Sequence, residues 1–212
     1  MRLMIDDIYE KMPWDEIDAV VFDVGQVLLS SEPMLFLEQL LPNQKDIQEK
    51  LSIRVFKSPY WIMMDRGTIT NEEAITAMTG KDELLRPYIQ LIMNSWIDFK
   101  HIISEGVEAV NICKAHGKKL YILSNYDNIF FYYACKKFDF FQLFDGKVVS
   151  SQVHMVKPTP AIYSYIVEKF NLNPSRTLFI DDTPANIEAA LNAGWHGFCM
   201  NQKGKLHNFI SE

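Results

Sequence analysis

The amino-acid sequence predicts an α/β protein, in which a parallel sheet flanked by helices on both faces is interrupted by an inserted helical subdomain. Short apolar runs typical of buried strands recur along the chain, and from about residue 105 they alternate with helical segments. Such alternation is typical of right-handed βαβ crossovers, which build parallel sheets. With 212 residues and 48% hydrophobic side chains, the chain can bury the core of one ordinary domain, with or without a small insertion.

The first strand is predicted over residues 19–22, an apolar run that ends at Asp23. The pattern then changes, because residues 32–100 show helical signals with little strand character. Pro33 is typical of a first helical turn, residues 70–73 (TNEE) fit a capping box, and Gly80 fits a helix end. We therefore expect a helical subdomain over residues 30–100, and a core built from residues 1–29 and 101–212.

Four further strands are predicted in the second half of the chain, over residues 119–123, 146–150, 177–180 and 197–200. Helices are predicted around them, near residues 106–116, 127–137, 160–170 and 184–193. The first strand is expected to join the same sheet from across the helical insertion.

Polar side chains follow these strands at their carboxyl ends, where open parallel sheets bind their ligands. They are Asp23, Ser124 with Asn125, Lys157 in the loop that follows its strand, and Asp181 with Asp182. Because the carboxyl ends of parallel strands share one edge of a sheet, the carboxylates, the hydroxyl and the ammonium group are predicted to form one site.

In these residues the chain resembles the haloacid dehalogenase-like hydrolase superfamily, in the branch with a small helical cap after the first strand. The resembling motifs come in the family's order and cover essentially the whole chain. They are residues 21–28 (VFDVGQVL), 122–125 (ILSN), 157–158 (KP) with 162–163 (IY), and 179–182 (FIDD) with Asn186. The resemblance implies a Rossmann-like core, a mobile cap, magnesium, and a covalent intermediate on an aspartate.

We interpret Asp23 as the nucleophile of a phosphatase. A carboxylate can attack phosphorus and form an acyl phosphate that water then hydrolyses, so one difficult displacement becomes two easier ones. Because carboxylate and phosphate repel each other, a divalent cation with oxygen ligands is expected, and Mg²⁺ fits best. Asp23, the backbone carbonyl of Gly25 and Asp182 are the expected ligands, with Asp181 sharing the metal or acting through water. Asn186 could hold a metal-bound water.

The expected substrate is a small phosphorylated metabolite, for example a sugar phosphate. Ser124 would bond a phosphate oxygen, helped by backbone N–H groups at Asn125 and the following helix start. Lys157 would bridge the phosphate and the nucleophile with a compact positive charge, so it is counted with Asp23 as catalytic. Taken alone, Ser124 and Asn125 could instead be helix caps, and Lys157 a solvated loop residue.

Gly25 departs from the family's pattern. Phosphatases of this superfamily usually carry a second aspartate there, which protonates the leaving group and then activates water, and such help is worth about a hundred- to ten-thousand-fold. The Asp-X-Gly-X-Val motif nevertheless resembles some sugar-phosphate phosphatases and the amino-terminal phosphatase-like domains fused to epoxide hydrolases. A glycosyl 1-phosphate, with its more acidic leaving hydroxyl, would tolerate the loss better. Tyr126 and His154 are candidate substitutes, although such isolated residues more often serve packing.

Two other functions stay open. A haloacid dehalogenase would displace halide from carbon with Asp23, and it also lacks the second aspartate. It needs an arginine shortly after the nucleophile, however, whereas the first one here is Arg54, and it does not use the metal that Asp181 and Asp182 favour. A non-catalytic member of the fold would bind metal and phosphate without turnover.

Specificity is expected to come from residues 59–67 (PYWIMMDRG) of the cap, a mixture that would suit a sugar-binding face. Trp61 is the expected substrate contact from this segment, and Tyr126 the one from the core. The alternative is that Trp61 and its neighbours only form the core of the cap.

The net charge of −6, without any long basic run, argues against nucleic acid or an anionic membrane as a partner. No apolar run approaches membrane-spanning length, and the N-terminus has acids where a signal peptide needs apolar residues. Cys113, Cys135 and Cys199 are widely spaced, so we expect buried or partly buried thiols rather than disulfides or a zinc cluster. A cytoplasmic protein is expected, and monomer and dimer remain open.

Overall fold

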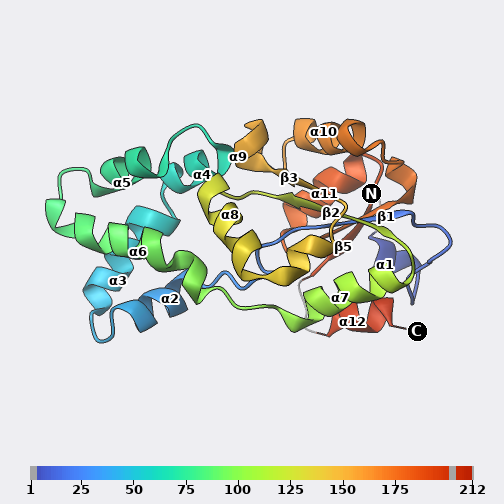
Figure 1. The fold of residues 1–212 in the computed structure, drawn as a ribbon, viewed down its shortest axis with the longest axis horizontal. Helices are drawn as coiled ribbons and strands as arrows, with labels where there is room; N and C mark the ends of the chain where they lie inside the picture. The colour runs from blue at the N-terminus through green and yellow to red at the C-terminus, as the bar shows by residue number, and fades with distance from the viewer. Residues whose placement is uncertain (1–3, 201–203, 212) are drawn as a thin grey trace.

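The computed structural model describes residues 4–200 and 204–211, and within them it contains a five-stranded parallel sheet with the strand order β3-β2-β1-β4-β5 (Figure 1). The strands are β1 Ala19–Phe22, β2 Lys119–Ser124, β3 Gly146–Val149, β4 Thr177–Asp181 and β5 His196–Cys199. Helices flank this sheet, so the predicted α/β fold is confirmed. The first strand lies at the centre of the sheet, which places whatever follows it at the middle of the carboxyl edge.

The strands are buried because helices cover both faces of the sheet. All residues of β1 and β4 are buried, as the near-continuous apolar runs of parallel strands require. Alternate side chains of β1 enter different cores, with Val20 and Phe22 in one and Ala19 and Val21 in the other. The first core includes residues of α1 Ile5–Ile8, α7 Ser104–Ala115, α8 Asn128–Lys137 and α12 Lys205–Ile210, and the second includes residues of α10 Pro160–Phe170 and α11 Pro184–Asn192.

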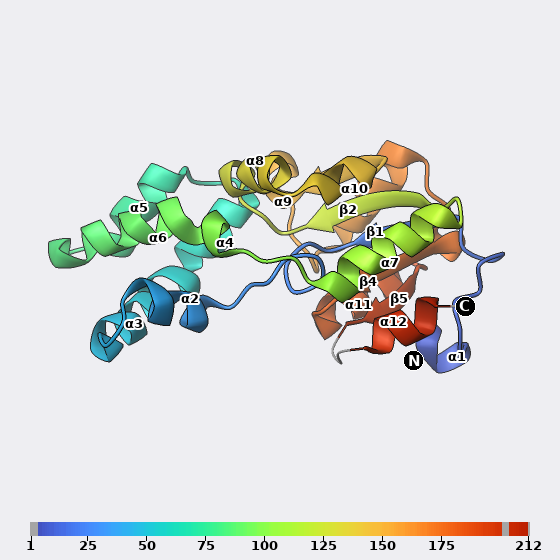
Figure 2. The same cartoon turned by 60° about the horizontal axis from the view of Figure 1, so that its bottom comes forward.

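A helical lobe lies beside the sheet, at the left of Figures 1 and 2. Its elements are α2 Pro33–Leu40, α3 Lys45–Leu51, the π-helical turn η1 Ser52–Phe56, α4 Pro59–Arg66, α5 Asn71–Thr79, the 3₁₀ turn η2 Glu83–Leu85 and α6 Arg86–Phe99. The expected helix start and stop signals are present: Pro33 begins α2, Thr70 and Glu73 form a capping box, and Gly80 ends α5. The helical character predicted for this part of the chain is therefore confirmed.

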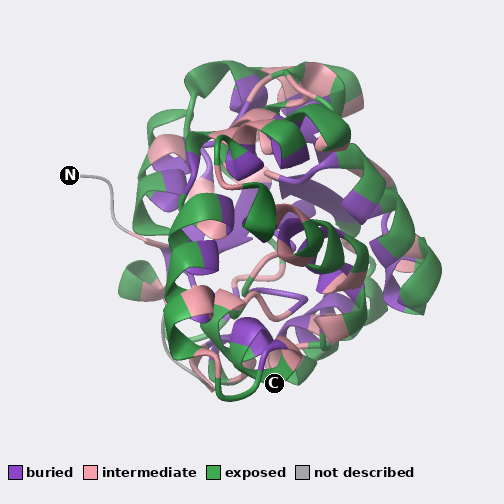
Figure 3. Cartoon of the chain, turned by 90° about the vertical axis from the view of Figure 1, so that its left-hand side faces the viewer, coloured by how far each residue is buried: buried purple, intermediate pink, exposed green. Residues whose placement is uncertain are grey.

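Two chain segments join the lobe to the sheet, and they run side by side. The N–H of Ser30 donates to the carbonyl of His101 over 2.8 Å, and the N–H of Ile103 donates to the carbonyl of Leu28 over 2.9 Å. Buried residues lie on the inward faces of the helices and exposed residues on their outward faces (Figure 3).

The lobe also contacts the core at a second place, the short helix α9 Ser150–Val153. The Ser150 hydroxyl donates to the carbonyl of Asp65, and Nδ1 of His154 lies 3.2 Å from the carbonyl of Arg66. Gly67, which ends α4 at φ +71°, packs so closely on Ser151 that a Cβ there would lie 2.2 Å from the Ser151 carbonyl oxygen. The end of α4 is thus held directly over the carboxyl edge of the sheet.

The predicted boundaries differ from the observed ones by a few residues. Strand β2 includes Ser124 and β4 includes Asp181, whereas β3 ends at Val149 and β5 begins at His196. Helix α9 stands between β3 and Lys157, so the lysine does not follow its strand directly. Short turns such as α9, η3 Asp139–Leu143 and η4 Pro174–Arg176 carry too few residues for a periodic signal.

Cys113 and Cys199 are buried and Cys135 is partly buried, all as free thiols, which confirms the expectation for them. Among the described residues, no helix combines the length and the apolar character needed to cross a lipid bilayer.

Candidate active site

Asp23, Ser124 and Asp181 come from the three central strands and meet at one edge of the sheet, and the segment after α9 brings Lys157 to them. Asp23 directly follows β1, whose neighbours are β2, ending at Ser124, and β4, ending at Asp181. The N–H of Asp23 donates to the carbonyl of Ile180 over 2.9 Å, which fixes Asp23 beside the end of β4. The predicted convergence therefore follows from the strand order.

Lys157 lies between two carboxylates. Its Nζ is 2.8 Å from Oδ1 of Asp23 and 2.6 Å from Oδ2 of Asp181, and all three side chains are buried. Burial alone would lower the pKa of Lys157, but the charges of Asp23 and Asp181 outweigh it and raise that pKa. The lysine is therefore a permanent cation and not a solvated loop residue.

Asn125 holds the Lys157 loop in place. Its Oδ1 accepts the backbone N–H of Lys157 over 2.8 Å, and its Nδ2 donates to the carbonyl of Lys157 over 3.0 Å. Asp127, not Ser124 or Asn125, caps α8, because its Oδ1 accepts two backbone N–H groups of the first turn over 3.0 Å each. The side chain of Asn125 is thus hydrogen-bonded to the backbone of Lys157. The predicted contact of Asn125 with phosphate can therefore come only from its backbone N–H.

The carboxylates of Asp23, Asp181 and Asp182 form a cluster in which one oxygen of each lies within 4.8 Å of the others. Asp181 is fully buried and accepts hydrogen bonds from Asn186 Nδ2 at 3.0 and 3.1 Å and from the Thr183 backbone at 2.8 Å, in addition to Lys157. Asp182 is less buried, and the contact of its side chain is with the Thr183 hydroxyl at 3.3 Å. Asp182 and Asp23 therefore have the more available oxygens.

The donor set fits a hard divalent cation. Three carboxylates share the site with the single ammonium group of Lys157, so the negative charge is not balanced by the described residues. Burial raises the pKa of Asp23 to about 6. The positive charge of Lys157 opposes this rise, and the negative charge of Asp181 adds to it. Burial and the charge of Asp181 also raise the pKa of Asp182. A cation with oxygen ligands would relieve this repulsion.

Two buried hydroxyls face this region without a hydrogen-bond partner of ordinary geometry among the described residues. They are Oγ of Ser124 and the phenol oxygen of Tyr126. Because buried polar groups are nearly always hydrogen-bonded, such groups mark places where a ligand or ordered water completes the structure. The Ser124 hydroxyl nevertheless lies close enough to the Asp23 carboxylate to lower the pKa of Asp23 through hydrogen bonding. Its contact with phosphate stays a prediction.

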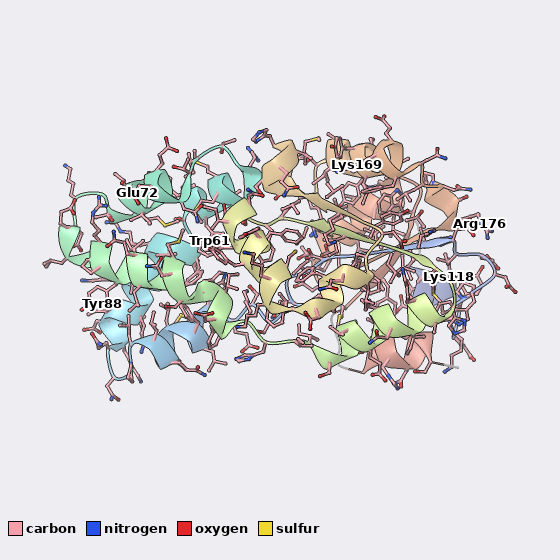
Figure 4. The ribbon with its side chains drawn as sticks, viewed as in Figure 1. Trp61, Glu72, Tyr88, Lys118, Lys169 and Arg176 are labelled. Carbon is pink, nitrogen blue, oxygen red and sulfur yellow. The ribbon has the colours of Figure 1, made fainter. Side chains whose placement is uncertain are left out.

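A cavity of about 240 Å³ opens over Asp23 and Gly25, between the sheet edge and the helical lobe. Its lining residues are Asp23, Gly25, Ser31, Pro33, Phe56, Trp61, Asp65, Trp96, Lys100, Asn125, Tyr126 and Phe130. Trp61 and Tyr126, both predicted to contact substrate, line it. Trp61 also packs on Phe56, with ring centroids 4.9 Å apart, and on Phe130 at 5.9 Å, where the lobe meets α8 (Figure 4). Trp61 therefore lines the cavity and also packs in the core of the lobe, and its contact with substrate stays a prediction.

Other residues singled out in the sequence lie elsewhere. His154 is exposed and is not among the residues that line the cavity, so it is poorly placed to replace the missing acid. Arg54 is exposed on η1 and does not line the cavity either. At Gly25 itself, a Cβ would meet no atom within 4 Å, so the position is open.

Sequence reasoning missed Lys100 and the role of Asp65. Burial raises the pKa of Asp65 to about 7, with a further contribution from the charge of Asp127, and burial lowers the pKa of Lys100 to about 7. Asp65 belongs to the segment expected to give specificity, so the sequence could have indicated it as a site residue. Lys100 lies at the end of the lobe, and no local sequence motif marks it as a site residue. It reaches the cavity only through the folding of the chain.

A family model described as haloacid dehalogenase-like hydrolase matches residues 17–194. A phosphorylated carbohydrates phosphatase of Thermotoga maritima is 25% identical over 185 residues, which cover 84% of this chain and 82% of the relative. A sesquiterpene phosphatase of Aspergillus oryzae is 22% identical over 179 residues, which cover 84% of this chain and 87% of the relative.

The fold is shared with solved structures. An enzyme of the same family from Bacteroides thetaiotaomicron, in complex with magnesium and inorganic phosphate, matches with a TM-score of 0.68 and 21% identity, covering 90% of this chain and 98% of that one. A dehalogenase with an intermediate complex matches with a TM-score of 0.69 and 17% identity, covering 89% of this chain and 87% of that one. At these identities the similarity concerns the fold alone.

Proposed function

The chain belongs to the haloacid dehalogenase-like hydrolase family, and on this basis we propose that it is a magnesium-dependent phosphatase of a small phosphorylated metabolite, acting through a phosphoaspartate on Asp23. The observation that carries this proposal is the position of Asp23, which lies at the floor of the cavity, 2.8 Å from the buried ammonium group of Lys157 and within the three-carboxylate cluster. The two relatives named above are both phosphatases, which supports phosphate chemistry.

The nucleophilic atom follows from the ion pair. Oδ1 of Asp23 is fully buried against Lys157, which leaves Oδ2 to attack. With a pKa of about 6, Asp23 is mainly ionised at neutral pH. Oδ2 forms a bond to phosphorus while the bond from phosphorus to the leaving oxygen breaks, and water then cleaves the acyl phosphate and regenerates the carboxylate.

The surrounding groups stabilise the charge of the transferred phosphoryl group. Lys157 contributes a fixed positive charge beside the nucleophile, and the buried hydroxyl of Ser124, which lies beside the Asp23 carboxylate, can donate to a phosphate oxygen. Asp23, Asp182 and the carbonyl of Gly25 would hold Mg²⁺, and Asp181 would orient Lys157 and Asn186. The ion would supply the positive charge that orients the phosphoryl group for in-line attack.

The leaving group receives no proton from residue 25. Substrates with an acidic leaving hydroxyl, such as a glycosyl 1-phosphate, should therefore react faster than simple alkyl phosphates. No arginine lines the cavity among the described residues, and the carboxylate cluster favours a metal, so the site suits phosphoryl transfer better than halide displacement.

The proposal is tested by measuring phosphate release from a panel of sugar phosphates and from an activated aryl phosphate, with Mg²⁺ or with EDTA. We expect release that depends on Mg²⁺ and stops with EDTA. Halide release from 2-haloacids without any phosphate release would instead identify a dehalogenase. Binding of Mg²⁺ and phosphate without turnover would identify a non-catalytic member of the fold.

A further inference from the structure

Lys100 is a buried cation without a counter-ion in direct contact. It follows the last residue of α6, is 3% exposed and lines the cavity above Asp23. Its Nζ lies 3.9 Å from the centre of the Trp96 ring, and among the described residues it makes no ion pair or hydrogen bond. A cation–π contact compensates only part of the cost of burying an ammonium group, and burial lowers the pKa of Lys100 to about 7.

Asp65 lines the same cavity from the last turn of α4. Its backbone is fixed to the core, because the Ser150 hydroxyl donates to its carbonyl. Its charge acts on Lys100 and raises that residue's pKa, although the two groups are not in contact as an ion pair. The cavity wall therefore presents the amino group of Lys100 as a donor and the carboxyl group of Asp65, which also accepts the backbone N–H of Asp127, as an acceptor.

We propose that Lys100 and Asp65 form the subsite for the organic part of the substrate, and that this part is an uncharged, hydroxylated group, as in a monosaccharide or polyol monophosphate. This inference rests on the proposed phosphatase function. Hydroxyl oxygens accept from Lys100 while hydroxyl protons are donated to Asp65. The faces of Trp61 and Trp96, which also line the cavity, contact the C–H surface of the ligand.

The charges of the cavity favour hydroxyls over a second anionic group. A second phosphate or a carboxylate at Lys100 would share the cavity with Asp65, whose pKa is already raised by burial and, to a smaller extent, by the negative charges of Asp127 and Asp23. A neutral hydroxylated group uses both the donor and the acceptor without adding charge. The cavity volume of about 240 Å³ is below the range of about 300–1,000 Å³ for drug-sized ligands, which fits a small metabolite.

The test compares the wild type with Lys100→Met on two substrates, a hexose monophosphate and an aryl phosphate that has no hydroxyls. Methionine keeps an unbranched side chain over Trp96 but removes the donor. We expect KM for the sugar phosphate to rise about ten- to hundredfold with little change in kcat, because a hydrogen bond from a charged group is lost. Both constants for the aryl phosphate should stay within about twofold.

Lys136→Met is the matched control, because Nζ of Lys136 also lies over an aromatic ring, 4.4 Å from the centre of Tyr132, but outside this cavity. It should change neither substrate's constants. Thermal unfolding of Lys100→Met should occur at or above the wild-type temperature, since an unpaired buried amine is removed.

An equal loss on both substrates, or no loss on the sugar phosphate, would overturn the subsite while leaving the phosphatase intact. Faster wild-type turnover of a hexose bisphosphate or a phosphorylated hydroxy acid than of the monophosphate would overturn the preference for a neutral group. If the wild type releases phosphate from neither substrate, the proposed function fails, and this inference fails with it.

Discussion

Two single residues, Lys157 and Gly25, have the largest influence on the chemistry that the site can perform. Lys157 holds one oxygen of Asp23 and one of Asp181, so a single cation aligns the proposed nucleophile and the carboxylate beside it. Gly25 lines the cavity without a side chain, at the position where the family usually has its proton donor. If the proposed function holds, the site is equipped to form the acyl phosphate better than to protonate a poor leaving group.

Gly25→Asp should add the missing proton donor. A Cβ at this position meets no atom within 4 Å, and Gly25 is not among the residues with positive φ, so the backbone accepts a side chain. We expect kcat for unactivated alkyl phosphates to rise, by up to about a hundredfold, with little change for an activated aryl phosphate that needs no proton. Steady-state kinetics on both substrates measure the difference, and Gly25→Asn is the matched control. Equal activity of the Asp and Asn variants on alkyl phosphates would mean that another group already serves as the acid.

Asp65→Asn should change the pH dependence of stability. The pKa of Asp65 is raised from its ordinary value to about 7, so between about pH 4 and pH 7 the folded state binds a proton that the unfolded state has lost. Ionisation of Asp65 therefore costs stability as the pH rises through this window. Denaturant unfolding should show Asp65→Asn to be more stable than the wild type at pH 8, with a smaller difference at pH 4.5. A difference that is constant with pH would contradict the raised pKa.

Much of this site could be predicted because its residues stand at strand ends. Asp23, Ser124 and Asp181 each end or follow an apolar run, and parallel strand order brings such ends together. Lys100 could not be predicted, since a lysine at the end of an amphipathic helix is ordinarily solvated. Its burial depends on Trp96 and on the packing of the lobe against the core, which no local pattern encodes.

At the scale of elements, the contact between α4 and α9 places the cavity wall over the nucleophile. Asp65, Arg66 and Gly67 all take part in it, through the carbonyl bonds to Ser150 and His154 and through the close approach of Gly67 to Ser151. This contact holds the lobe over the site together with the contacts that the lobe makes with α8, such as that of Trp61 with Phe130. The sequence predicted helical character for this part of the chain but not this contact, because α9 has only four residues.

Gly67→Ala should open this contact. The added Cβ would lie 2.2 Å from the Ser151 carbonyl oxygen, and the left-handed backbone at φ +71° costs about 1–2 kcal/mol for a residue with a side chain. We expect a lower free energy of unfolding and a tenfold or larger loss of kcat/KM on sugar phosphates. Gly117→Ala is the control, because Gly117 has the same φ but nothing within 4 Å of its Cβ position. If both variants lose the same activity, backbone strain and not the α4 contact is responsible.

At the scale of the whole molecule, the sheet gathers more negative charge at its carboxyl edge than Lys157 balances. The regular alternation of strands and helices made the sheet predictable from the sequence, since periodicity is a local property. How the lobe is seated on the sheet is a tertiary property, set by contacts such as that of Trp61 with Phe130.

Magnesium should stabilise the folded chain. A ligand that binds only the folded state at about a hundred times its Kd adds about 2.7 kcal/mol, which corresponds to a rise in Tm of about 5–10 °C for a chain of this size. Thermal unfolding with Mg²⁺ and with EDTA measures this shift, and Asp182→Asn should reduce it. A wild-type Tm that does not respond to Mg²⁺ would speak against a metal at the carboxylate cluster.

The most direct test of the central claim is mass spectrometry of the acid-quenched enzyme during turnover of an aryl phosphate with Mg²⁺. We expect a phosphoryl group on the peptide that contains Asp23, and neither label nor turnover in Asp23→Asn. Asp46→Asn, which changes an exposed aspartate on α3, should behave like the wild type. Undiminished phosphate release by Asp23→Asn, or a label on any other residue, would contradict the central claim.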